Sequence, residues 1–135
     1  MEDKVGHHNV YVAIIDDDES MCRSMSRLLR AAHFQPVAYP SAEAFLLDRN
    51  HPKFGCLILD IRLQGMSGLE LRHRLAAVSD TTPVVFVTAY DEPDVRAEAE
   101  AAGCAFFLKT EPGANVLACV RRLSGTAATR AAGEE

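Results

Sequence analysis

Short apolar runs alternate along this chain with stretches in which apolar residues recur every three or four positions. The apolar runs are rich in β-branched residues, which favour strands, and the other spacing is that of an amphipathic helix. The predicted strands cover residues 10–15, 35–39, 56–59, 83–88 and 105–109, and the predicted helices cover residues 20–32, 41–47, 68–78, 91–102 and 112–123.

This alternation predicts an α/β fold class, with a doubly wound five-stranded parallel sheet and five helices on its two faces. The runs VYVAII, CLIL and PVVFV are apolar without interruption, as expected of strands buried on both faces. Pro36 suits an edge strand. We expect one domain over residues 10–124, a disordered lead over 1–9 and a flexible tail over 125–135.

Composition narrows the possible functions. The formal net charge is −5 over 135 residues and no basic cluster is visible, so direct nucleic-acid binding is not expected. The four cysteines are scattered without metal-ligand spacing, which favours reduced thiols in a cytoplasmic protein. No apolar run approaches the ~18 residues of a membrane span, so no membrane association is expected.

Acidic residues follow two of the predicted strands. Asp16 and Asp17 come directly after the first, and Asp60 ends the third. If the strand order is 2-1-3-4-5, these two strands are neighbours and the three carboxylates converge at the carboxyl edge of the sheet, where open α/β folds bind their ligands.

Clustered carboxylates need a cation. Mg²⁺ (or Mn²⁺) suits such a site because it takes a few carboxylate oxygens and keeps several waters. A carboxylate beside the bound metal can act as a nucleophile toward a phosphoryl group, forming an acyl phosphate. The hydroxyl of Thr88, at the end of the fourth strand, could donate a hydrogen bond to a phosphoryl oxygen.

With these motifs in order, residues 9–124 resemble the receiver domain of two-component response regulators, nearest to the nitrogen-fixation regulator type. The resemblance is carried by IIDDDES, PSAEAFL, LDIRLQGMSGLEL, PVVFVTAY and AGCAFFLK. It implies a flavodoxin-like fold and a phosphorelay function in signal transduction. It also implies that Asp60 is the phosphoacceptor and that Asp16, Asp17, Asp60 and the backbone carbonyl of Arg62 hold the metal.

The resemblance further implies a conformational switch. Thr88 would be the switch hydroxyl, Phe107 the aromatic that changes rotamer with it, and Ala89 the small residue that leaves room for the phosphoryl group. The implied partners are a sensor histidine kinase or phosphotransfer protein. A second copy of the chain or an effector would bind the face formed by the fourth helix, fifth strand and fifth helix.

Two positions depart from the family pattern. Gln64 stands where the family usually has proline, so we expect a looser loop there. Counting from Gly103 and from Phe107 places Thr110 at the position of the usual lysine, with Lys109 one residue early. Strand residues alternate faces, so Lys109 is expected to point away from the site unless a bulge re-aims it.

These departures keep other functions open. A degenerate receiver would bind partners without phosphorylation, and would be favoured by loss of the lysine. A metal-dependent phosphohydrolase of the haloacid-dehalogenase type would use Asp60 as nucleophile, but needs a second aspartate where Arg62 stands. The signalling output is not indicated, because only about eleven residues without an apolar face follow the last predicted helix.

Overall fold

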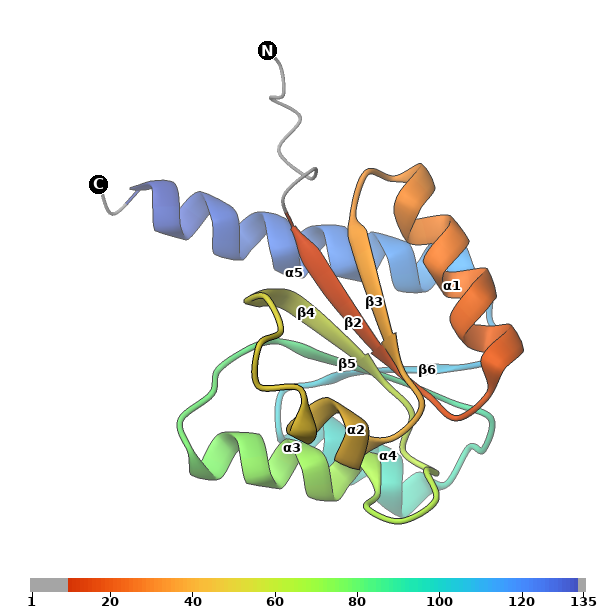
Figure 1. The fold of residues 1–135 in the computed structure, drawn as a ribbon. Helices are drawn as coiled ribbons and strands as arrows, with labels where there is room; N and C mark the ends of the chain where they lie inside the picture. The colour runs from red at the N-terminus through yellow and green to blue at the C-terminus, as the bar shows by residue number, and fades with distance from the viewer. Residues whose placement is uncertain (1–9, 134–135) are drawn as a thin grey trace.

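Five parallel strands form one sheet in the structure, a computed structural model that describes residues 10–133 and the side chains of residues 10–125. The sheet order is β3-β2-β4-β5-β6, which is the predicted order 2-1-3-4-5 (Figure 1). The predicted fold class is therefore confirmed. The strands are β2 (Tyr11–Ile15), β3 (Gln35–Tyr39), β4 (Phe54–Leu59), β5 (Val84–Thr88) and β6 (Ala105–Leu108).

Five helices cover the two faces of this sheet in the described part of the chain (Figure 1). Helices α1 and α5 lie on one face, and α2, α3 and α4 lie on the other. Their bounds are α1 (Glu19–Ala31), α2 (Ala42–Leu47), α3 (Gly68–Ala77), α4 (Pro93–Ala101) and α5 (Gly113–Gly133). No helix within residues 10–133 is both long enough and apolar enough to cross a membrane.

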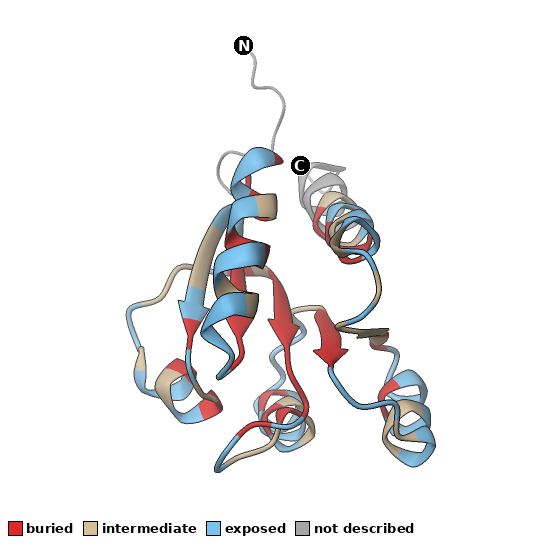
Figure 2. Cartoon of the chain, turned by 90° about the vertical axis from the view of Figure 1, so that its right-hand side faces the viewer, coloured by how far each residue is buried: buried red, intermediate tan, exposed pale blue. Residues whose placement is uncertain are grey.

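Each continuous apolar run contributes side chains to two separate hydrophobic cores, because successive side chains of a strand point to opposite faces of the sheet. In β2, Val12 and Ile14 pack with α1 and α5, whereas Ala13 and Ile15 pack with α2 and α3. Figure 2 shows the central strands buried between helices whose outer sides are exposed. The edge strand β3 is only partly buried and contains Pro36, as the sequence indicates.

Short polar side chains start three of the helices. Asp18, Ser41 and Ser67 accept hydrogen bonds from the first free backbone N–H groups of α1, α2 and α3. Helix α4 differs, because its N-cap residue, Glu92, makes no such side-chain bond.

The last helix is longer than the sequence analysis predicted. We expected it to end at Leu123 and a flexible tail to follow from residue 125, but α5 continues to Gly133. The added segment is rich in alanine, which has the highest intrinsic helix propensity and needs no packed face to continue a helix already begun. Residues 134–135 and the predicted lead 1–9 lie outside the described residues.

Candidate functional site

Three acidic side chains meet at the carboxyl edge of the sheet. Asp16 and Asp17 follow β2 and Asp60 follows β4, and these strands are hydrogen-bonded neighbours. The Asp60 backbone N–H donates to the Ile15 carbonyl at 3.0 Å, so the two strands end level. One carboxylate oxygen from each acid lies within 4.8 Å of the others. The structure thus brings together the acids that the sequence singled out.

Backbone contacts fix the orientation of these carboxylates. Asp16 accepts a hydrogen bond from the Asp18 N–H at 2.9 Å, and Asp60 accepts one from the Arg62 N–H at 3.2 Å. Gly68, at the start of α3, lies directly against the Asp60 main chain: a Cβ there would be 2.2 Å from the Asp60 carbonyl oxygen. Glycine is therefore required at this position so that α3 can approach the phosphoacceptor candidate.

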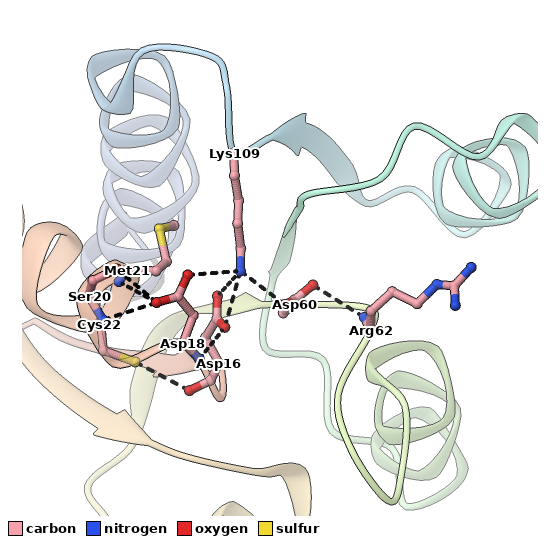
Figure 3. Close-up of polar contacts among 8 residues, drawn as sticks. All are labelled: Asp16, Asp18, Ser20, Met21, Cys22, Asp60, Arg62 and Lys109. Carbon is pink, nitrogen blue, oxygen red and sulfur yellow. Dashed lines mark hydrogen bonds and ion pairs between the residues drawn. The ribbon is translucent and has the colours of Figure 1, made fainter.

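Lys109 lies in the middle of the acidic cluster. Its ammonium Nζ is 3.0 Å from Asp16 Oδ2, 3.2 Å from Asp60 Oδ2 and 3.9 Å from Asp18 Oδ2. Figure 3 shows the Lys109 side chain extending from the end of β6 to the carboxylates of Asp16, Asp18 and Asp60. Only 18% of the Lys109 side chain is exposed, so these charges interact with limited screening.

The expectation that Lys109 points away from the site is therefore wrong. No bulge is needed, because β5 and β6 pair in continuous register up to Thr88 and Leu108. Lys109 is the first residue past the strand, held by a 2.8 Å bond from its N–H to the Thr88 carbonyl. Beyond the end of the strand, the alternation of side chains between the two faces no longer sets the direction of the Lys109 side chain. Its four-carbon stem can therefore reach across the edge of the sheet. Thr110 is exposed and does not take the place of the lysine.

Thr88 lies beside this cluster at the end of β5. It is 1% exposed, and its hydroxyl has no hydrogen-bond partner among the described residues. A buried hydroxyl without a partner is unfavourable, and functional sites are one of the places where it is retained. Ala89, which follows it, is exposed and has no bulk to cover the carboxylates.

The structure separates Phe107 from Thr88. Phe107 packs on the core under α1 and α5, together with Val85 and Val87 of β5. Thr88 alternates with Val87 and therefore faces the other core, where Phe106 is buried with Phe86. A run of two phenylalanines does not show which of them faces a given side, so the resemblance alone could not distinguish Phe107 from Phe106.

The loop after β4 is anchored at its far end, although it lacks the family proline. Gln64 is exposed, and Gly65 has a positive φ of 79°. The next residue, Met66, donates its N–H to the Glu43 carboxylate of α2 at 2.7 Å. The role of Glu43 was not predicted from the sequence, because its spacing from Asp16, Asp17 and Asp60 follows no pattern. Whether Gln64 loosens the loop stays a prediction.

Burial controls the charge state of Asp16. Removal from water raises its pKa, the Asp18 N–H and Lys109 lower it, and the nearby Asp60 charge raises it, with a net pKa of about 6. For Lys109, burial alone lowers the pKa, but the bonds to Asp16 and Asp60 outweigh it and the net pKa is raised. The cluster therefore keeps a charged ammonium beside a carboxylate that ionises reluctantly.

Comparison with known proteins shows the family of this chain. The family model of the response regulator receiver domain matches residues 12–120. The chain belongs to this family.

The receiver domain is 32% identical over 111 residues to the response regulator protein TmoT of Ectopseudomonas mendocina, covering 82% of this chain and 50% of that protein. It is 34% identical over 130 residues to the transcriptional regulatory protein FixJ of Azorhizobium caulinodans, covering 92% and 59%. Among solved structures, response regulator StyR superposes with a TM-score of 0.80 at 34% identity, covering 92% and 63%. The chain thus spans about half the length of the curated relatives it matches.

We predict that replacing Asp16 by asparagine stabilises the metal-free protein at neutral pH. The folded pKa of about 6 lies above the ordinary value of 3.8, so wild-type stability falls as pH rises through this interval. The amide side chain of Asp16→Asn keeps an acceptor for the Asp18 N–H but carries no charge. The free energy of unfolding should rise by about 1–3 kcal/mol at pH 7.5. Urea melts from pH 4.5 to 8 measure this, with the exposed Asp17→Asn as control, and a gain independent of pH would contradict the assignment.

Replacing Lys109 by methionine should act in the opposite direction. Methionine keeps much of the aliphatic stem but leaves Asp16 and Asp60 without their counter-ion. We expect a loss of about 1–3 kcal/mol at pH 7.5, because removing one partner of a largely buried ion pair leaves uncompensated charge. The same urea melts measure it. Thr110→Val is the matched control, and an equal loss in that variant would mean that the ion pairs do not contribute.

Proposed function

We propose that this receiver domain accepts a phosphoryl group on Asp60 and thereby switches a protein-binding face. The observation that carries the proposal is a pair of groups at the carboxyl edge of the sheet, where Asp60 lies. The Lys109 ammonium lies 3.2 Å from its carboxylate, and the buried Thr88 hydroxyl lacks a partner among the residues that the structure describes. An ammonium and a hydroxyl donor are what a dianionic phosphoryl group on Asp60 would require.

The donor would be the phosphohistidine of a sensor histidine kinase or phosphotransfer protein. A carboxylate oxygen of Asp60 attacks phosphorus as the P–N bond breaks, which gives an acyl phosphate and a free imidazole. Lys109 offsets the charge that builds up on the phosphoryl oxygens. The relatives named as response regulators support this role, and the domain would act in signalling rather than as a turnover enzyme.

The acidic cluster fits a divalent metal. Three carboxylate oxygens within 4.8 Å form the hard oxygen set that Mg²⁺ or Mn²⁺ prefers, and Lys109 neutralises only part of their charge. Asp16, Asp17, Asp60 and the Arg62 carbonyl would hold the ion. When bound, the metal would neutralise phosphoryl oxygens during transfer.

The switch would run from Thr88 to the face formed by α4, β6 and α5. The hydroxyl of Thr88 would turn to donate to the phosphoryl oxygen, which vacates space on the α4 side of the sheet. Phe106 is the aromatic on that side, and Arg96 of α4 lies over its ring at 4.9 Å. We therefore assign Phe106, in place of Phe107, as the residue that would respond. An effector or a second copy would bind the changed face.

The two alternatives now have less support. The degenerate receiver was favoured by a misplaced lysine, and Lys109 reaches Asp60. The phosphohydrolase needs an acid where Arg62 stands, and the Arg62 side chain is bonded to Glu92 instead.

Phosphorylation should be detected by intact-protein mass spectrometry after incubation with acetyl phosphate and Mg²⁺. We expect wild-type protein to gain one phosphate and Asp60→Asn to gain none. Thr88→Val should be phosphorylated but should lose any phosphate-dependent association in gel filtration, because the partner of the phosphoryl oxygen is missing. A phosphate gain that persists in Asp60→Asn would remove Asp60 as the acceptor.

Divalent metal should stabilise the wild-type protein without phosphate. Three clustered carboxylates repel one another, and an ion that binds only the folded state raises its stability by mass action. Thermal melts at pH 7.5 with and without ~10 mM MgCl₂ should show a higher melting temperature for wild type. Asp17→Ala should show little shift, and CaCl₂ at equal ionic strength provides a comparison. An equal rise in Asp17→Ala would argue against this ligand set.

A further inference from the structure

The side chain of Arg62 turns away from Asp60 and bonds to another loop. Its Nε donates to Glu92 Oε1 at 3.0 Å, and Nη2 donates to Glu92 Oε2, so the guanidinium and carboxylate form a two-point pair. The same guanidinium lies 5.4 Å from the centre of the Tyr90 ring. Figure 3 shows the Arg62 side chain directed away from the acidic cluster, although its backbone N–H still donates to Asp60.

The two residues that Arg62 contacts lie in the segment that joins Thr88 to α4. Tyr90 and Glu92 are two and four residues after Thr88, and Glu92 is the N-cap residue of α4. The Glu92 carboxylate pairs with Arg62 and makes no hydrogen bond to the first turn of α4. Arg62 therefore ties the loop that follows Asp60 to the loop that follows Thr88.

We propose that Arg62, Tyr90 and Glu92 form a latch that holds the β5–α4 loop in its unphosphorylated position and opens when Asp60 is phosphorylated. This inference rests on the proposed function, since phosphorylation is what opens the latch. When Thr88 turns to the phosphoryl oxygen, the short link to Tyr90 transmits the displacement. The Tyr90 ring and the Glu92 carboxylate then move away from the Arg62 guanidinium, and their contacts with it break.

The strength of the latch suits this role. The side chains of Arg62 and Glu92 are 56% and 35% exposed, and exposed ion pairs contribute little stability. The two-point geometry and the Tyr90 ring restrict the Arg62–Glu92 pair to one arrangement. The pair therefore favours one position of the loop, but little free energy is needed to break it. The latch thus biases the two loop positions rather than locking one.

The latch predicts how phosphoryl mimics bind. Arg62→Gln and Glu92→Gln should each bind beryllofluoride, in the presence of Mg²⁺, about two- to fivefold more tightly than wild type, the range that an exposed ion pair allows. The double variant should show no further gain, because either substitution alone opens the latch. Titrations followed by NMR would give the apparent Kd, and amide exchange in the first turn of α4 would report the loop position.

Two further variants separate a latch from a structural effect. The reversed pair, Arg62→Glu with Glu92→Arg, should return the beryllofluoride affinity toward the wild-type value. Arg74→Gln with Glu70→Gln removes an exposed pair on α3, whose charged atoms are 3.5 Å apart, and should leave that affinity unchanged. Thermal melts of each variant check that all are folded.

The outcomes distinguish the latch from the proposed function. Unchanged affinity in the single variants, or additive gains in the double variant, would overturn the latch while wild-type binding upholds phosphorylation. If the wild type neither binds beryllofluoride nor accepts phosphate, the proposed function fails and the latch fails with it.

Discussion

The balance of charge at the carboxyl edge of the sheet is the constraint on which the site depends. Asp16 and Asp60 are 3% and 5% exposed, and two carboxylates so close together and so little hydrated repel each other. The Lys109 ammonium lies between them and keeps this arrangement tolerable at neutral pH. Negative charge remains at this edge, because one ammonium faces a cluster of three acidic side chains.

Everything around this edge holds the carboxylates in place. Strands β2 and β4 are buried on both faces, so their ends are fixed by two cores. The close approach of Gly68 sets α3 against the Asp60 main chain, and the Glu43 carboxylate anchors the loop between them. These contacts hold Asp60 in a fixed position at the end of β4.

The segment that follows the neighbouring strand β5 is held less tightly. Beyond Thr88 the chain leaves the core, and its contacts become exposed: the Arg62–Glu92 pair, the Tyr90 ring and an N-terminus of α4 without a side-chain cap. Segments held by a few exposed contacts are the ones that move at low free-energy cost. The domain thus combines a tightly held Asp60 after β4 with a loosely held segment after β5.

The sequence by itself determined the five strands and their assembly into a parallel sheet. Given the strand order 2-1-3-4-5, it also predicted that Asp16, Asp17 and Asp60 meet. Buried parallel strands read as continuous apolar runs, and an acid that ends such a run must lie at the carboxyl edge. Only the tertiary structure decided the rest. The direction of Lys109 depends on where β6 ends, and the choice between Phe106 and Phe107 depends on the phase of its pairing with β5. The contacts of Glu43 and Arg62 join segments distant in the chain, so no local pattern could encode them.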